Sequence, residues 1–195
     1  MLIHFVRHTT PEIQANICYG QKDIELAHSF EEESSLILRT LELQSNKAQY
    51  DKIFSSPAKR CMQLAKKIEQ KQPSKHIIKT INALQEVNFG DWEGKHWDTI
   101  CRTESQAWTD DFINTAPPNG ESLIEMKQRV DAFLQQLLAS NASNIIVVTH
   151  AGVLRLVAAY FLKIPLENIF NLKLSYGAIF SVQLINKSYS LQFIS

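Results

Sequence analysis

Short apolar runs and longer amphipathic stretches alternate along this chain. Runs rich in β-branched and aromatic residues predict buried strands, and apolar residues spaced three or four positions apart predict helices that pack on one face. The predicted strands cover residues 2–6, 52–54, 76–81, 144–149, 178–184 and 189–194. The run at 144–149 is almost continuously apolar, which is typical of a strand at the centre of a sheet.

Capping signals mark where several helices begin. Ser29 precedes a run of glutamates, Ser56 precedes Pro57, and Ser122 lies three residues before a glutamate. Such patterns are typical of helix N-termini. Helices are therefore predicted over about 30–44, 57–68 and 123–137, and two more over 97–112 and 153–162. This order of strands and helices predicts an α/β three-layer sandwich with a mostly parallel sheet, as a single domain over residues 1–195.

The composition excludes several classes of partner. Lys plus Arg and Asp plus Glu both number 20, so no basic surplus favours nucleic acid or an anionic membrane. The three cysteines, Cys18, Cys61 and Cys101, are odd in number and far apart, which favours reduced thiols over a disulfide framework. No signal peptide or membrane-spanning stretch is evident. We expect a soluble, cytoplasmic protein, and these patterns specify no oligomeric state.

Charged side chains follow several of the predicted strands. Arg7 and His8 end the first strand, His150 ends the strand at 144–149, and Arg60 lies in the first helical turn after the strand at 52–54. A loop-like segment at 84–94, rich in aromatic, acidic and glycine residues, carries Glu86. Because the carboxyl ends of parallel strands meet at one edge of a sheet, we expect these groups to share a site.

This set of groups suits the hydrolysis of phosphate monoesters. Arg7 and Arg60 can neutralise and orient a phosphoryl group, and a neutral His8 can attack phosphorus to give a phosphohistidine. His150 and the amides at the start of the helix near Gly152 can stabilise the transferred group. A carboxylic acid must protonate the leaving oxygen. No metal or other cofactor is required, because the side chains supply the positive charge.

These motifs resemble those of the histidine phosphatase superfamily, in its phosphoglycerate-mutase-like branch. The matching segments are residues 6–8, 55–60, 85–94 and 148–155, in the family's order. The resemblance implies His8 as nucleophile, Arg7, Arg60 and His150 as the phosphate pocket, and Glu86 as proton donor. The substrate would be a small-molecule phosphate ester.

A closer likeness is to the α-ribazole phosphatase group, which acts late in cobalamin assembly. It rests on residues 7–9, 18–23, 30–33 and 120–123. The glycines usual after the two histidines are replaced by Thr9 and Ala151, and the asparagine of mutases by Gln14, which argues against mutase activity. Residues expected to contact substrate are Gln14, Tyr19, Gly20, Gln21 and Ala151.

Other interpretations of the same residues stay open at this point. Asp91 and Glu93 compete with Glu86 for the acid role, and His4 could pair with His8 on a metal, although a core histidine is the simpler reading. Trp92 and Trp97 could stack on an aromatic base or merely pack. The alternative functions are a broad-specificity sugar or nucleotide phosphatase and a catalytically weak phosphate-binding interaction domain.

Overall fold

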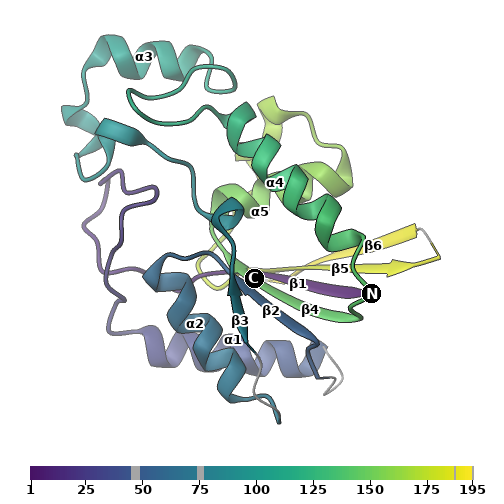
Figure 1. Cartoon of the computed structure of the whole chain (residues 1–195). Helices are drawn as coiled ribbons and strands as arrows, with labels where there is room; N and C mark the ends of the chain where they lie inside the picture. Colours follow the sequence, from purple (N-terminus) through teal and green to yellow (C-terminus); the bar gives the residue numbers. More distant parts are fainter. Residues whose placement is uncertain (45–48, 74–76, 187, 195) are drawn as a thin grey trace.

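One six-stranded sheet runs through the computed structural model, which describes residues 1–44, 49–73, 77–186 and 188–194 (Figure 1). The strand order is β3-β2-β4-β1-β5-β6. The strands are β1 (Leu2–Arg7), β2 (Lys52–Ser55), β3 (Ile78–Thr80), β4 (Asn144–Thr149), β5 (Ile179–Ile185) and β6 (Ser188–Ile194). The third strand is shorter than predicted, and His76 lies outside the described residues.

The sheet is parallel on one side and antiparallel on the other. β1, β2, β3 and β4 run parallel, whereas β5 pairs antiparallel with β1 and β6 pairs antiparallel with β5. The apolar run at 144–149 forms β4, which lies between β2 and β1 and is buried along nearly its whole length. Its prediction as a central strand is confirmed, and so is the mostly parallel α/β fold.

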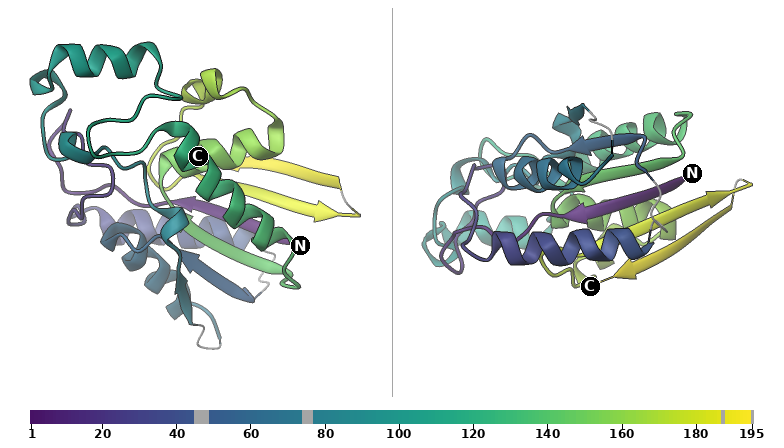
Figure 2. Two further views of the ribbon diagram at one scale, coloured as in Figure 1. Left: turned by 45° about the horizontal axis from the view of Figure 1, so that its top comes forward. Right: turned by 90° about the horizontal axis from the view of Figure 1, so that it is seen from below.

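Helices cover both faces of the sheet and complete three layers. They are α1 (Phe30–Gln44), α2 (Lys59–Gln70), α3 (Arg102–Asp110), α4 (Leu123–Leu138) and α5 (Ala151–Leu162). Figures 1 and 2 show α1 and α2 on one face and α4 and α5 on the other. Two apolar clusters match these layers, one joining β-strand residues to α4 and α5 and the other joining them to α1 and α2. Among the described helices, none combines the length and apolar character needed to cross a bilayer.

The carboxyl ends of the parallel strands are covered by less regular segments. The loop at residues 11–27 lies over this edge, as predicted, and α3 stands away from the sheet beside it (Figure 1). Short 3-10 helices connect the remainder: η1 (Asn82–Leu84), η2 (Gly90–Trp92), η3 (Trp97–Thr99) and η4 (Leu166–Asn171). The polar edge groups are therefore enclosed by loops rather than by another layer of the core.

Two helix predictions were wrong because tertiary contacts override local signals. The helix predicted over 97–112 is broken into η3 and α3, since Ile100 and Cys101 are extended and Ile100 is buried in a cluster with Trp92. Ser56 is not the N-cap of α2, which begins at Lys59 after Ala58. Its hydroxyl instead lies 2.8 Å from His150 Nε2.

The other predicted caps have mixed outcomes. Ser122 and Glu125 form the expected capping box at the start of α4. Ser29 bonds Glu33 rather than Glu32, and the same Glu33 carboxylate accepts the Thr10 amide at 2.8 Å. This contact ties α1 to the segment that follows His8.

Candidate active site

The two histidines are brought together by the pairing of the central strands. β1 and β4 are in parallel register with Arg7 opposite Thr149, so His8 and His150 each follow their strand at the same level. Their ring centroids lie 5.1 Å apart, and both residues are buried. The sheet edge therefore places a histidine pair where parallel-sheet proteins bind ligands.

His8 has one ring nitrogen held and the other free to react. Its Nδ1 lies 2.7 Å from the Thr9 carbonyl oxygen, which can only accept, so Nδ1 carries the proton and donates. Burial, with the positive charges of Arg60 and Arg7 nearby, holds the pKa of His8 well below its ordinary value. The ring is therefore neutral near pH 7, and Nε2 keeps its lone pair.

His150 is oriented by two residues of the segment at 55–61. Its Nε2 lies 2.8 Å from Ser56 Oγ and 3.5 Å from Cys61 Sγ. Burial and the neighbouring His8 lower the pKa of His150 as well. Burial likewise raises the pKa of the Cys61 thiol, so this sulfur packs as a neutral group beneath the imidazole.

The two arginines flank the histidines and are held by backbone carbonyls. Arg60, in the first turn of α2, donates to the Gly20 oxygen at 2.7 Å and the Lys22 oxygen at 2.9 Å. Arg7 donates to the Leu174 oxygen at 2.5 Å, and its guanidinium lies 3.9 Å from the centre of the Tyr176 ring. Both charges are thus fixed beside His8 before any anion binds.

Several donors at this site make no hydrogen bond within the protein. In the described part of the chain, the buried polar atoms without a partner include Arg7 Nε, Arg60 Nε and Thr9 Oγ1. Buried donors are normally paired, because an unpaired one carries a desolvation penalty of about 1–3 kcal/mol. Two fixed guanidinium charges and a surplus of donors favour an anion over a neutral ligand at this site.

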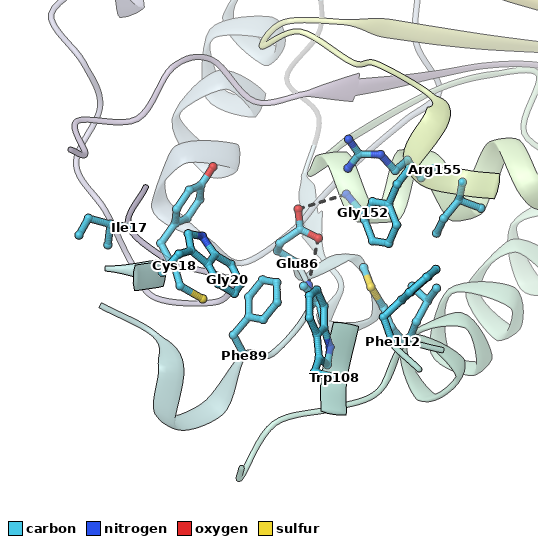
Figure 3. A pocket seen from close by; sticks show the side chains of 16 residues that line it. Ile17, Cys18, Gly20, Glu86, Phe89, Trp108, Phe112, Gly152 and Arg155 are labelled. Carbon is cyan, nitrogen blue, oxygen red and sulfur yellow. Dashed lines mark hydrogen bonds between the residues drawn. The ribbon is translucent and has the colours of Figure 1, made fainter. Parts of the chain in front are cut away.

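Glu86 lines a cavity together with Gly152 and Arg155 (Figure 3). Its carboxylate accepts the Val87 amide at 3.0 Å and the Gly152 amide at 3.1 Å. The Gly152 amide at the start of α5 was expected to serve the phosphate, and this expectation is corrected because Glu86 takes it. A side chain at Gly152 would overlap the Glu86 carboxylate, so glycine leaves room for the carboxylate in this position.

The competing acids serve the surrounding loops. Glu93 accepts the amides of Gln21 and Phe89 at 2.8 and 3.1 Å, and Asp91 accepts the Asn119 side-chain amide at 2.9 Å. These contacts leave Glu86 as the carboxylate at the cavity wall.

The expected substrate-contacting residues divide into three groups. Tyr19 and Gly20 line the cavity, and Ala151 is buried at the first position of α5, next to His150. Gln21 donates its side chain to the Glu86 carbonyl at 3.0 Å and so supports the acid's segment. Gln14 is exposed in the loop and does not line the cavity, so its contact with substrate stays a prediction.

His4 lies in the core, and Trp92 and Trp97 belong to or pack against one aromatic cluster. His4 Nδ1 lies 2.7 Å from Ser181 Oγ in the core, and in the described part of the chain no three His, Cys, Asp or Glu side chains gather to hold a metal. Trp92 is buried in a cluster with Cys18 and Ile100, whereas Trp97 lines the cavity.

Three further residues of the site were missed by the sequence reasoning. Ser56 contacts His150, and Tyr176 packs over Arg7 and touches the Tyr19 hydroxyl at 3.2 Å. Arg129 of α4 donates to the carbonyls of Ala83, Gln85 and Glu86, at 2.8, 2.8 and 3.1 Å. Because β5 pairs antiparallel with β1, the residues just before β5 lie at the same sheet edge as His8, and this pairing could have pointed to Tyr176. Ser56 lies in the matching segment 55–60 but was interpreted only as a helix cap, and no local pattern pointed to Arg129.

The fold and this geometry define a class of protein, an α/β protein with two buried histidines and two arginines at the carboxyl edge of its sheet. The model of the histidine phosphatase superfamily (branch 1) matches residues 3–195, so this chain belongs to that superfamily. With phosphatases among its relatives, it is a phosphoric monoester hydrolase.

The relatives include the group expected from the motifs. The adenosylcobalamin/alpha-ribazole phosphatase of Salmonella typhimurium is 30% identical over 144 residues, 71% of this chain and 70% of the relative. The glucosyl-3-phosphoglycerate phosphatase of Mycobacterium tuberculosis H37Rv is 26% identical over 128 residues, 60% of this chain and 56% of the relative. The structure of the α-ribazole phosphatase from Shigella flexneri has a TM-score of 0.84 at 25% identity, covering 98% of this chain and 95% of that chain.

Proposed function

We propose that this enzyme is a metal-independent phosphatase that forms a phosphohistidine on His8 and acts on α-ribazole 5′-phosphate or its cobalamin-linked form. The observation that carries the mechanism is the tautomer of His8. Nδ1 donates to the Thr9 carbonyl, so the free Nε2 of a neutral ring is the nucleophile, flanked by Arg7 and Arg60.

The first half-reaction transfers the phosphoryl group to the protein. His8 Nε2 attacks phosphorus, the ester P–O bond breaks, and the leaving oxygen takes a proton from the Glu86 carboxylic acid. Arg7, Arg60 and His150 stabilise the charge on the transferred group. The two amides that bind the Glu86 carboxylate, from Val87 and Gly152, hold it at the cavity wall where the alcohol departs.

The second half-reaction restores the enzyme. The Glu86 carboxylate accepts a proton from water while the water oxygen attacks phosphorus. The N–P bond breaks and its electron pair returns to His8 Nε2, which releases inorganic phosphate. Glu86 is again protonated, so protons and charge balance over one turnover.

The support for this particular substrate comes from the relatives, because the pocket chemistry suits phosphate esters in general. The Salmonella relative and the Shigella structure are both named as α-ribazole phosphatases. The mycobacterial relative is named for a different phosphate ester, glucosyl-3-phosphoglycerate, so a broad-specificity sugar or nucleotide phosphatase is the second candidate.

Phosphate release tests both levels of the proposal. α-Ribazole 5′-phosphate is compared with sugar and nucleotide phosphates in excess EDTA, for the wild type and His8→Ala. We expect a kcat/KM for α-ribazole 5′-phosphate well above the panel, and its loss in the variant. Comparable rates across the panel would discard the cobalamin substrate. Full activity of His8→Ala would overturn the mechanism. So would the loss of wild-type activity in EDTA.

A further inference from the structure

The segment that carries Glu86 has no regular secondary structure of its own. It follows η1, and residues 85–89 belong to neither a helix nor a strand. A carboxyl group that donates a proton must nevertheless stay within hydrogen-bond reach of the leaving oxygen. Because this stretch of backbone lacks the hydrogen bonds of a helix or a sheet, the position of Glu86 depends on contacts from other elements.

Arg129 of α4 binds the backbone of this segment. Its guanidinium donates to three carbonyls at 2.8, 2.8 and 3.1 Å, those of Ala83, Gln85 and Glu86. The Thr149 hydroxyl, at the end of β4, donates to the Leu84 carbonyl at 2.7 Å. Four successive carbonyls are therefore held by side chains, which tie the backbone at Glu86 to α4 and to the central strand.

Glu121 holds Arg129 in place and binds the far end of the same segment. Its carboxylate accepts Nε of the guanidinium at 2.9 Å and a terminal nitrogen at 2.5 Å. Together with the three carbonyls, these contacts use all five N–H donors of Arg129. The Glu121 carboxylate also accepts the Asn88 amide at 2.9 Å, and the Glu121 amide donates to the Asn88 carbonyl at 2.9 Å.

The geometry of this ion pair explains its presence better than stability does. The side chains of Arg129 and Glu121 are only 22% and 17% exposed, and taking charges out of water offsets most of what their attraction contributes. A planar guanidinium, however, can bind a carboxylate and several carbonyls in fixed directions, which an apolar side chain or a lysine cannot do. The pair is therefore suited to fixing a backbone.

We propose that Arg129 is a positioning residue for ester cleavage, which together with Glu121 fixes the backbone of Glu86 so that its carboxyl group meets the leaving oxygen. The inference rests on the proposed function of Glu86 as the acid. The Glu86 carboxylate is bound by the amides of Val87, within the fixed segment, and of Gly152 in α5 (Figure 3). Without Arg129 the first of these amides shifts relative to the second, and the carboxyl group leaves its place.

The test compares two esters whose leaving groups need the acid to different degrees. 4-Nitrophenyl phosphate releases a stable phenolate without a proton, whereas ribose 5-phosphate releases an alcohol that needs one. The parameter kcat/KM reports the steps up to cleavage of the ester bond and excludes the later attack of water. In Arg129→Gln we expect kcat/KM for ribose 5-phosphate, relative to 4-nitrophenyl phosphate, to fall about tenfold, part of the roughly 10²–10⁴-fold contributed by a general acid.

Two further variants separate positioning from a general loss of structure. Lys127→Gln removes another cation of α4, whose ion-pair partner is Asp131 of the same helix, and should keep the wild-type ratio of the two esters. Arg129→Lys keeps the charge but not the planar group, so it should lower the ratio by a smaller factor. It replaces Arg129→Gln if thermal unfolding shows that this variant does not fold.

Two results would overturn the proposal. One is a wild-type ratio of the two esters in the folded Arg129 variant. The other is an equal loss of kcat/KM for both esters, which a merely structural role of Arg129 predicts.

Failure of this inference can be told from failure of the proposed function. Glu86→Gln should lower the same ratio, and adding Arg129→Gln to it should change the ratio little further, because both changes act on one carboxyl group. If Glu86→Gln keeps the wild-type ratio, Glu86 is not the acid, and the proposed mechanism falls together with the inference. If Glu86→Gln lowers the ratio and Arg129→Gln does not, only the positioning role of Arg129 is wrong.

Discussion

Two regions are built from different parts of the fold: the predicted phosphate pocket of Arg7, His8, Arg60 and His150, and the aromatic cavity around Phe89, Trp108 and Phe112. The pocket is made at the ends of regular elements: His8 follows β1, His150 follows β4, and Arg60 lies in the first turn of α2. The cavity is lined largely by loops, 3-10 helices and the outlying α3. In the proposed function, the groups that meet the reacting atom thus stand at the ends of strands or in the first turn of α2, whereas the groups nearest the alcohol stand on connections.

The two regions also differ in their most exposed residues, although Cys18, Met126 and Ile169 of the cavity are buried. His8, Arg60 and His150 are 0–1% exposed, whereas Phe170 of the cavity is 43% exposed. A change in the buried pocket should therefore affect every substrate alike. A change in the cavity should alter the choice among substrates.

The largest effect is expected for Arg60→Ala. Loss of a buried guanidinium that faces the transferring charge should lower kcat/KM about 10²–10³-fold, and by the same factor for ribose 5-phosphate and adenosine 5′-monophosphate. Arg60→Lys keeps the charge but not the planar guanidinium group, so its kcat/KM should lie between those of the wild type and Arg60→Ala. Steady-state kinetics measures the ratios, with thermal unfolding as the check on folding.

Two outcomes would break the comparison at this residue. An unchanged kcat/KM would remove Arg60 from the mechanism. A loss of kcat/KM confined to adenosine 5′-monophosphate would mean that Arg60 acts through the loop that it holds at Gly20. This loop lines the cavity.

A smaller effect is expected at the boundary between the regions. In Gly152→Ala the new methyl group would overlap the Glu86 carboxylate and displace it. We expect kcat for alkyl phosphates to fall about tenfold, less than the roughly 10²–10⁴-fold contributed by a general acid, because the carboxyl group is displaced rather than removed. Aryl phosphates should lose less, because their leaving groups need no proton. Alanine is favoured over glycine in a helix by about 1 kcal/mol, so the fold should remain stable.

Glu86→Gln is the comparison variant for this prediction. It should show the same bias against poor leaving groups, and adding Gly152→Ala to it should lower kcat little further, because both changes act on one carboxylate. Equal losses for aryl and alkyl phosphates would count against Glu86 as the acid.

The smallest effect concerns pH, to which the buried histidines on the sheet side should respond. Burial lowers the pKa of His4 to about 4, and the pKa values of His8 and His150 lie well below the ordinary 6.5. Above pH 6.5 both the folded and the unfolded states are neutral at these sites. Below it the unfolded chain takes up protons that the folded state excludes, so the free energy of unfolding falls.

Urea unfolding at pH 7.5, 6 and 5 measures this loss, and His4→Asn isolates one site. His4 should contribute up to about 1.4 kcal/mol per pH unit below 6.5, so the variant should lose less stability on acidification. The three tryptophans of the chain, Trp92, Trp97 and Trp108, all lie in the aromatic region and report on it by fluorescence, while far-UV circular dichroism follows the whole fold. If the free energy of unfolding of the variant has the same pH dependence as that of the wild type, His4 does not contribute to the loss of stability on acidification.

The gathering of Arg7, His8 and His150 at one sheet edge was predictable because it depends on local signals. Arg7 and His8 come at the end of one apolar run and His150 at the end of another, and parallel strands bring such positions to one edge. The aromatic cavity was not predictable in this way. The stretch at 97–112 has a helical pattern, yet it breaks at Ile100 and Cys101 so that Ile100 is buried and Trp97 and Trp108 can stack.

Ser56 shows most directly what only the tertiary structure decided. Its position before Pro57 is that of a helix cap, but its hydroxyl bonds His150, 94 residues away, and Asp23 of the loop accepts the first amide of α2, from Lys59, at 2.9 Å. The sequence by itself determined the strands, most helices and the reactive groups at their ends, since these follow from periodicity and short motifs. The partners of Ser56, Arg7 and Glu86 were decided by packing, because each partner lies on a distant segment that the fold places beside it.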